Sequence, residues 1–205
     1  VEGYGLSETS PLLTCNPING TSKLGTIGLP VPSTEIKIIG DDGEEKLVGD
    51  FGEIWAKGPQ VMTGYWQNQK ETDIVMAGDW FKTGDIAFFD SEGFIKIVDR
   101  KKEMINVSGM KVFPNEVEDV IAKLDGVLEV GVIGVAHKTS GEVVKAFVVK
   151  KDKNLSEEEI MRHCREHLVA YKMHKHIEFR EELPKSNVGK ILRKELRKDE
   201  ANNVA

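Results

Sequence analysis

The chain has 205 residues, of which 40% are hydrophobic and 30% charged, and its formal net charge is -6. This composition is typical of a soluble globular protein, and the length allows one medium domain or two small ones. The acidic balance argues against nucleic acid as a partner, and no apolar run approaches the roughly 20 residues that a membrane-spanning helix needs.

The first half of the chain is predicted to form small antiparallel strands joined by turns. Glycines in residues 1–17 indicate a loop that exposes polar side chains. Alternating apolar residues predict strands, and the glycine-containing loop 90–93 predicts a hairpin. The expected elements are strands 35–39 and 52–57, a short helix at 67–76, and the hairpin strands 86–89 and 94–98.

A charged joint follows this first half. In residues 94–114 a strand pattern ends in the charged run 99–103, which has neither the length nor the composition of a flexible Gly/Ser linker. A short charged segment between two folded parts is a candidate hinge. The sequence therefore predicts two parts, joined at 99–103, that contribute to one active site.

Helices and strands alternate in the second half. Pro114 suits a first helical position, and Ser156 followed by Glu159 forms a capping-box pattern. Gly126 is predicted to end the first helix, and the second is predicted to face inward through Ile160, Cys164, His167 and Leu168. The other expected elements are strands 127–135, 143–149 and 177–179, the loop 184–189 and a last helical turn at 191–196.

Two features bear on compartment and charge. The only cysteines, Cys15 and Cys164, lie far apart and outside any metal-ligand spacing, which indicates structural, reduced thiols in a cytosolic protein. Basic residues gather at 100–111 and 185–198 in an otherwise acidic chain, which favours two local anion sites.

The chain also begins with Val1 inside a glycine-rich motif, which predicts a piece of a longer protein.

The first motif, residues 3–9 (Gly-Tyr-Gly-Leu-Ser-Glu-Thr), suits a nucleotide bound together with a metal ion. Adenine can stack on Tyr4, and Glu8 can hold Mg²⁺ because hard cations take oxygen ligands. The alternative is a solvated turn in which Glu8 has no role.

Three later positions carry similar alternatives. Asp85, after Thr83-Gly84, can accept two hydrogen bonds from a sugar diol or can be an ordinary turn residue. Arg100 presents a fork of donors for a ribose or phosphate, whereas Lys101 and Lys102 can simply be solvated. Lys190 can reach a phosphate or carboxylate from its loop, or decorate the surface.

One histidine pair has helical spacing. His163 and His167 lie four residues apart, but zinc requires further ligands, so the pair is interpreted as a partly buried helix face without a metal.

These motifs, in this order, resemble the C-terminal part of the adenylate-forming enzymes, the superfamily of acyl-CoA synthetases, luciferases and peptide-synthetase adenylation domains. Among its members the chain is most similar to bacterial long-chain fatty acid CoA ligases. The matching segments are residues 3–9, 64–66 (Gly-Tyr-Trp), 80–85 (Trp-Phe-Lys-Thr-Gly-Asp), 99–102 (Asp-Arg-Lys-Lys) with Gly109 and Pro114, and 184–190.

The resemblance implies an α+β fold: the β-rich end of a large N-terminal adenylation domain at 1–99, then a small α+β lid domain at 100–205. It implies ATP-dependent conversion of a fatty acid to an acyl-adenylate, then to a thioester with coenzyme A, with Mg²⁺ as cofactor. It also implies a cytoplasmic parent protein with peripheral contact at the inner membrane. The partners would be fatty acid, ATP, CoA and the upstream part of the same chain, and not nucleic acid.

The resemblance assigns a role to each matching residue. Tyr4 and Gly5 would flank adenine, Ser7 would contact phosphate, Glu8 would bind Mg²⁺, and Asp85 with Arg100 would hold the ribose. Lys102 would be the pivot of the lid, Ser108 and Gly109 would line the CoA approach, and Lys190 would bridge carboxylate and phosphate oxygens during adenylation.

Two departures qualify the match. Ser7 stands where many relatives have threonine, which keeps the hydroxyl, and His174 stands where relatives usually carry proline, which would loosen its loop. The family's phosphate loop and most of the acyl pocket belong upstream of Val1, so the chain alone is expected to be inactive. The alternatives are an amino-acid or aryl-acid adenylation domain and a noncatalytic nucleotide-binding module.

Overall fold

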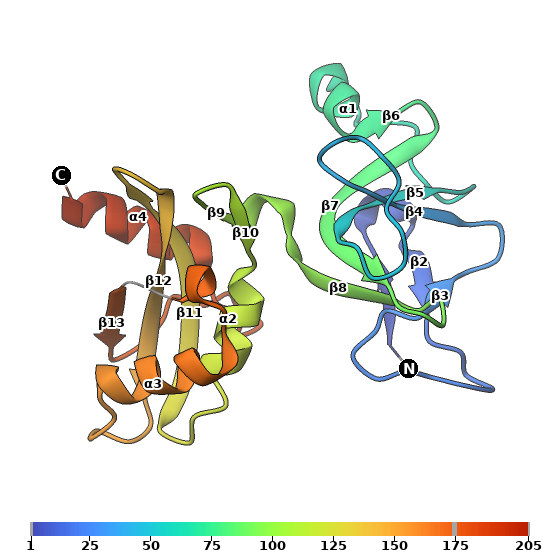
Figure 1. The fold of residues 1–205 in the computed structure, drawn as a ribbon. Coiled ribbons are helices and arrows are strands. Elements are labelled where there is room, and N and C mark those ends of the chain that lie inside the picture. Colours follow the sequence, from blue (N-terminus) through green and yellow to red (C-terminus); the bar gives the residue numbers. More distant parts are fainter. Residues whose placement is uncertain (1, 174–175, 205) are drawn as a thin grey trace. The chain divides into compact units, whose positions relative to one another are not determined.

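The computed structural model describes residues 2–173 and 176–204, which divide into two compact units, Val1–Lys102 and Glu103–Ala205 (Figure 1). His174 lies outside the described residues, so the predicted effect of its replacing proline stays a prediction. The assignment of residues 1–99 and 100–205 to parts of larger domains also stays a prediction. Among the described residues, no helix combines the length and the apolar character that crossing a membrane requires.

Antiparallel strands form the first unit, as the alternating pattern predicts. The larger sheet has the order β4-β5-β7-β6, with β8 paired to β7, and its buried face includes Ile38, Ile54 and Ile95. A smaller sheet has the order β1-β2-β3. The elements are β1 (Gly3–Gly5), η1 (Ser7–Thr9), β2 (Leu12–Cys15), β3 (Leu29–Pro30), β4 (Glu35–Ile39), β5 (Gly52–Lys57), α1 (Gln69–Val75), β6 (Met76–Ala77), β7 (Trp80–Phe89) and β8 (Ile95–Arg100).

The prediction of a loop for residues 1–17 is wrong. β1 and β2 pair antiparallel, with the single 3-10 turn η1 between them. Strands this short, beside glycines, carry too few residues for an alternating pattern to be visible. Gly5 is required for packing, because a Cβ there would lie 1.6 Å from the carbonyl oxygen of Pro11.

Strand β7 is also longer than predicted. It begins at Trp80, so Thr83, Gly84 and Asp85 lie inside a ten-residue strand and not at its start. The interpretation of Asp85 as a turn residue is therefore wrong.

The second unit is an α+β module around a five-stranded sheet of order β10-β9-β12-β11, with β13 paired parallel to β12. The short helix η2 (Lys101–Glu103) precedes it, spanning the boundary between the units. The other elements are β9 (Ile105–Val107), β10 (Met110–Val112), α2 (Pro114–Ile121), β11 (Val127–His137), β12 (Gly141–Lys150), α3 (Glu157–His167), η3 (Ala170–Lys172), β13 (His176–Arg180) and α4 (Arg193–Val204).

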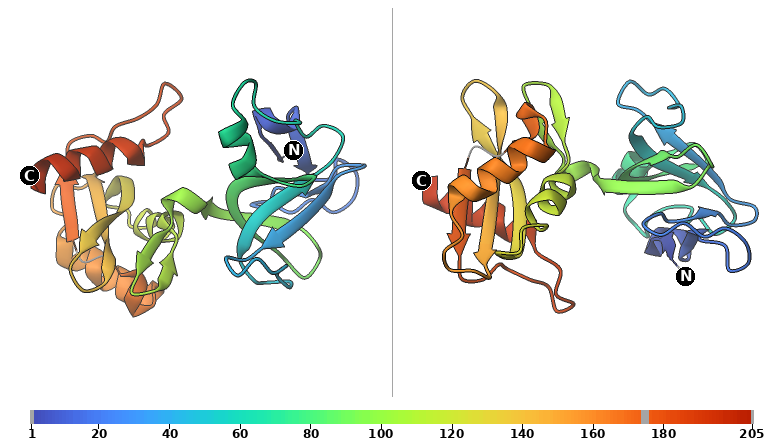
Figure 2. Two further views of the ribbon diagram at one scale, coloured as in Figure 1. Left: turned by 90° about the horizontal axis from the view of Figure 1, so that it is seen from above. Right: turned by 60° about the horizontal axis from the view of Figure 1, so that its bottom comes forward.

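This sheet has an apolar core on each face, because alternate residues of β11 and β12 point to opposite sides. Val132 and Val148 pack with α2 and α3, whereas Ile133 and Phe147 pack with Leu196 of α4. In the view of Figure 1, α2 and α3 lie in front of the sheet and α4 lies behind it. The left view of Figure 2 shows the same layers from above.

The helix predictions were partly right. Pro114 is the first residue of α2, and the Ser156 side chain accepts a hydrogen bond from the Glu159 N–H, as the capping pattern predicts. However, α2 ends at Ile121 and not at Gly126, because backbone turns take over at residue 122. The final helix, predicted at 191–196, runs over Arg193–Val204.

His167 does not face inward as predicted. It is exposed at the last position of α3, where its Nδ1 lies 2.9 Å from the carbonyl oxygen of His163. Ile160 and Cys164 are fully buried and Leu168 is nearly so, so the rest of the predicted inward face is confirmed.

The two cysteines are free and differ in environment, which leads to a testable prediction. Cys164 is fully buried, and this burial raises its pKa to about 11, whereas Cys15 is half-buried. Because the thiolate is the nucleophile, iodoacetamide at pH 8 is expected to alkylate Cys15 well before Cys164. Mass spectrometry of the native and the urea-unfolded chain measures both rates. Equal native rates would contradict the buried environment of Cys164.

Candidate functional site

Three predicted site residues meet in the first unit. β1 supplies Tyr4, β7 supplies Asp85, and β8 places Arg100 directly opposite Asp85. The Tyr4 hydroxyl donates to Asp85 Oδ2 at 2.6 Å, and Arg100 Nε lies 3.5 Å from Asp85 Oδ1. Burial is the largest cause that raises the pKa of Tyr4 well above its usual value, and the negative charge of Asp85 is the second largest. The carboxylate of Asp85 is thus oriented by a neutral donor and faced by a cation.

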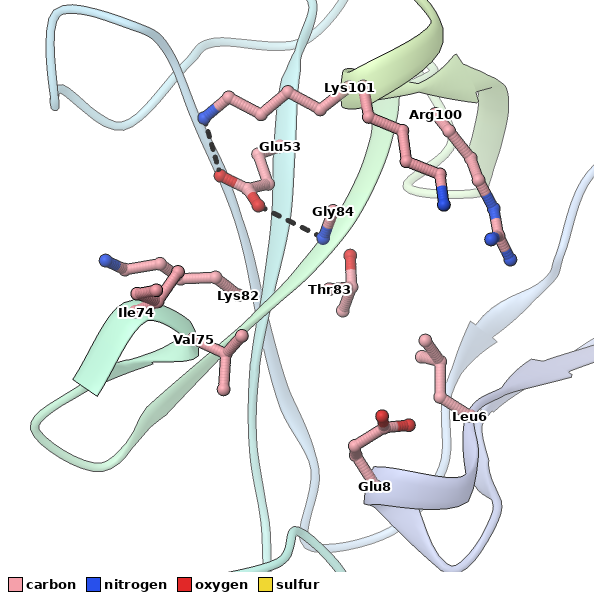
Figure 3. A pocket seen from close by; sticks show the side chains of 11 residues that line it. Leu6, Glu8, Glu53, Ile74, Val75, Lys82, Thr83, Gly84, Arg100 and Lys101 are labelled. Carbon is pink, nitrogen blue, oxygen red and sulfur yellow. Dashed lines mark hydrogen bonds and ion pairs between the residues drawn. The ribbon is translucent and has the colours of Figure 1, made fainter. Parts of the chain in front are cut away.

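Beside this cluster lies an open cavity of ≈ 600 Å³ (Figure 3). In Figure 3, Glu8 and Leu6 lie across the cavity from Arg100 and Lys101. Cationic side chains outnumber carboxylates in its lining, which suits an anionic ligand such as a polyphosphate. The lining residues are Leu6, Glu8, Glu53, Ile74, Val75, Lys82, Thr83, Gly84, Arg100, Lys101 and Lys102.

Glu8 is held at the edge of the cavity by two contacts. Its backbone carbonyl accepts from the Met62 N–H at 2.8 Å, and its Oε1 accepts from the Tyr65 hydroxyl at 2.8 Å. Burial is the largest cause that raises the pKa of Tyr65, and the hydrogen bond to Glu8 is the second largest. A half-exposed carboxylate next to a cavity is the kind of oxygen ligand that Mg²⁺ takes together with waters and phosphates. The residues present therefore fit a magnesium ion.

Ser7 and Gly5 are both exposed, and both are sequence neighbours of the cavity-lining residue Leu6. Ser7 begins η1, and Gly5 ends β1. Neither residue lines the cavity. Their predicted contacts with phosphate and adenine stay predictions, as does the adenine contact of Tyr4.

The second unit presents Ser108 and Gly109 at the tip of the β9–β10 hairpin. Both are exposed and have positive φ, 53° and 86°. The Gly109 N–H donates to Asn106 Oδ1 at 2.8 Å, and the Ser108 N–H donates to the Ser140 carbonyl at 2.8 Å. The tip therefore has a defined backbone, and its predicted role at CoA stays a prediction.

Lys190 lies in a loop that is closed by backbone contacts. A bridge joins Lys185 to Ile191, the Ser186 N–H donates to the Lys190 carbonyl at 2.8 Å, and Gly189 has φ 79°. The left view of Figure 2 shows the segment before α4 projecting from its unit. The loop thus exposes Lys190 from an ordered turn. The predicted site residues consequently fall into two groups, one in each unit.

Sequence reasoning missed Glu53 and treated Lys101 as solvated. The Glu53 carboxylate accepts from Lys101 Nζ at 2.9 Å and from the Gly84 N–H at 3.0 Å, and its side chain is only 9% exposed. The signal available in the sequence was an acidic residue within the apolar pattern of strand 52–57. This pattern indicates burial, and a buried carboxylate requires hydrogen-bonding or charged partners.

The pair His163 and His167 forms a donor group with Glu166, whose ligand atoms lie within 4.8 Å of one another. His163 Nε2 lies 3.0 Å from the Val120 carbonyl, and His167 is bonded to the carbonyl of His163. One nitrogen of each ring therefore lies within hydrogen-bond distance of a backbone carbonyl.

Two family models match the chain. The model of AMP-binding enzymes matches residues 1–66, and the model of the AMP-binding enzyme C-terminal domain matches residues 116–190. The two matches fall in different units of the structure.

Curated relatives match nearly the whole chain. A long-chain-fatty-acid CoA ligase of Yersinia pestis is 56% identical over 200 residues, which are 98% of this chain and 36% of that protein. The corresponding ligase of Bacillus subtilis is 46% identical over 205 residues, 99% of this chain and 37% of that protein. The chain thus spans about a third of the length of these relatives.

Solved structures agree with this match. ATP-bound MatB from Rhodopseudomonas palustris is 34% identical, with a TM-score of 0.90, over 97% of this chain and 40% of that chain. The o-succinylbenzoate CoA synthetase MenE from Bacillus subtilis, with its acyl-adenylate intermediate, gives 34% identity and a TM-score of 0.85 over 96% of this chain and 40% of that one. The predicted α+β fold is confirmed.

Proposed function

Because the chain belongs to the family of AMP-binding, adenylate-forming enzymes, we propose that it is the C-terminal part of an ATP-dependent long-chain fatty acid CoA ligase. The observation that carries this proposal is the cationic cavity beside the Tyr4–Asp85–Arg100 cluster, in a chain 56% identical to such a ligase. In the whole protein, residues 1–99 complete the adenylation domain and 100–205 form a lid, with the hinge at 99–103.

The first unit binds the nucleotide. Asp85 and Arg100 hold the ribose diol, because a nearly buried carboxylate next to a guanidinium offers both acceptors and donors. Tyr4 fixes Asp85 through its hydroxyl and, with Gly5, flanks adenine. Ser7 donates its hydroxyl to a phosphate oxygen.

Glu8 would hold Mg²⁺ at the edge of the cavity, where the Tyr65 hydroxyl orients its carboxylate. When bound, the ion neutralises phosphate charge. Arg100, Lys101 and Lys102 supply further positive charge along the same cavity.

The second unit supplies the groups that differ between the two steps. Lys190 bridges carboxylate and phosphate oxygens while the fatty acid attacks ATP, forming the acyl-adenylate and releasing pyrophosphate. Ser108 and Gly109 line the approach of the CoA thiol, which then attacks the acyl carbonyl and displaces AMP. Lys102 is the pivot that exchanges these groups.

The test is a pyrophosphate-release assay of the whole protein with ATP, Mg²⁺ and carboxylic acids of different kinds. We expect release with long-chain fatty acids, followed by thioester formation when CoA is added. Release with amino acids or aryl acids alone would favour the alternative adenylation domains. No release with any acid, combined with calorimetric binding of ATP, would favour a noncatalytic nucleotide-binding module.

We also propose that the parent protein is cytoplasmic, with peripheral contact at the inner membrane, where long-chain acids partition. Sedimentation of the whole protein with vesicles made from anionic and neutral phospholipids tests this. A protein that stays in the supernatant with both would contradict it.

A proline at the pivot gives a further prediction. Lys102→Pro fixes φ near about -65° and removes a backbone N–H, so it is expected to slow one half-reaction at least about tenfold more than the other, a difference of ~1.4 kcal/mol in barrier. Pyrophosphate exchange and thioester formation from supplied acyl-adenylate measure the two steps. Lys102→Ala, which keeps backbone freedom, is the control. Unchanged kinetics or equal losses in Lys102→Pro would remove the pivot role.

A further inference from the structure

Glu53 is a buried carboxylate to which the proposed mechanism gives no role. Its side chain is 9% exposed, whereas that of its partner Lys101 is 46% exposed. Lys101 Nζ donates to Oε2 at 2.9 Å, the Gly84 N–H donates to Oε1 at 3.0 Å, and Trp55 Nε1 lies 3.4 Å from Oε2. Figure 3 shows Glu53 between Lys101 and Gly84, with a contact to each. Each carboxylate oxygen therefore accepts from a donor outside β5, Gly84 of β7 on Oε1 and Lys101 of η2 on Oε2.

The local backbone explains this placement. β5 pairs with β7, Glu53 opposite Ile86, and the register shifts between Glu53 and Trp55. Gly84 has φ 75°, a conformation that favours glycine and turns its N–H toward the carboxylate. The Thr83 hydroxyl also donates to the Ile54 carbonyl at 2.9 Å. The Thr83–Gly84 segment is thus tied to β5 twice, immediately before Asp85.

The contact with Lys101 extends this network to the predicted pivot. Lys101 is the residue before Lys102, and Arg100, one residue earlier, is paired with Asp85 in the sheet. Glu53 therefore links the strand that carries the ribose-binding carboxylate to the last residue before the pivot. The N–H groups of Gly84 and Trp55 hold the Glu53 carboxylate in position. Lys101 therefore has an ion-pair partner whose position is fixed.

We propose that Glu53 is a positioning residue that anchors Lys101 to the Thr83–Gly84–Asp85 segment, so that turning of the lid is confined to residues after Lys101. The inference rests on the proposed function for its consequence in catalysis. The anchoring contact itself does not depend on that function.

Limited trypsin digestion of the chain tests the anchor. Trypsin must take the Lys101 ammonium into its specificity pocket, so cleavage after Lys101 requires release from Glu53. In Glu53→Gln the charge is lost while the amide oxygen can still accept from Gly84. We expect cleavage after Lys101 to rise about threefold, the size of effect expected on losing a half-exposed ion pair. Cleavage after Lys190, in the exposed loop of the other unit, should not change.

Two variants make this digestion decisive. Glu45→Gln removes an exposed carboxylate paired with Lys37 at 3.4 Å, so it should leave cleavage after Lys101 unchanged. Glu53→Ala should also expose the Gly84 amide to hydrogen exchange. Unchanged cleavage in Glu53→Gln would overturn the proposal, and so would a rise at both lysines, which would indicate general loosening.

The catalytic consequence is measured in the whole protein as the ratio of CoA-dependent turnover to adenylate formation. We expect Glu53→Gln to lower this ratio by about threefold. An unchanged ratio in an active enzyme would overturn the confinement of the pivot. If the wild-type protein forms no adenylate, the proposed function fails, and the digestion still decides whether Glu53 holds Lys101.

Discussion

Replacement of Lys190 by alanine in the whole protein is expected to lower the rate of acyl-adenylate formation by about 10²–10³-fold. A preorganised cation beside developing phosphate charge contributes on this scale. Thioester formation from supplied acyl-adenylate should remain at the wild-type rate, because Lys190 is proposed to act only in the first step. Single-turnover pyrophosphate release and thioester formation measure the two steps separately.

The structure indicates that this substitution removes the ammonium group without unfolding the loop. The Lys190 side chain is exposed, and the turn around it is closed by backbone groups and by Ser186, so truncation should leave the loop folded. Lys194→Ala, an exposed lysine on the following helix, is the matched control and should keep both rates. Equal loss in both steps for Lys190→Ala would eliminate the proposed role.

The regular elements could be predicted from the sequence where the apolar pattern is long. β4 and β5 begin and end where the alternation predicts, because each has one face in the core. β1 and β2 were missed because their pairing depends on the close approach of Gly5 to Pro11, a contact that a single short segment does not encode. Helix α2 ends earlier than its apolar spacing indicates, although Leu124 still packs against the same core.

The site could be predicted only as separate residues. Tyr4 and Asp85 were each assigned to the nucleotide, but their hydrogen bond joins positions 81 residues apart and follows from the sheet arrangement. Glu53 was missed because its partners, Gly84 and Lys101, lie 31 and 48 residues away. The apolar neighbours of Glu53 in its strand are a sequence signal for a buried carboxylate, but only the tertiary structure shows which donors satisfy it.

Leu196→Ala tests how the second unit holds the Lys190 loop in place. Leu196 is fully buried in α4 and packs with Phe147, Ile133 and Leu183 on one face of the sheet. It lies over Gly131, where a Cβ would come within 2.9 Å of its side chain. Truncation leaves a cavity, so the free energy of unfolding of this unit is expected to fall by about 2–5 kcal/mol.

Hydrogen exchange of β11 and β12 amides measures this loss in the unit concerned. The three tryptophans, Trp55, Trp66 and Trp80, all lie in the first unit, so their fluorescence reports whether that unit stays folded. Leu128→Ala, at a β11 position that is 60% exposed, is the control and should change stability by no more than ~0.5 kcal/mol. If both variants cost the same, the apolar contact between α4 and the sheet does not hold this face together. Because α4 begins three residues after Lys190, Leu196→Ala should also slow adenylate formation with the lysine itself intact.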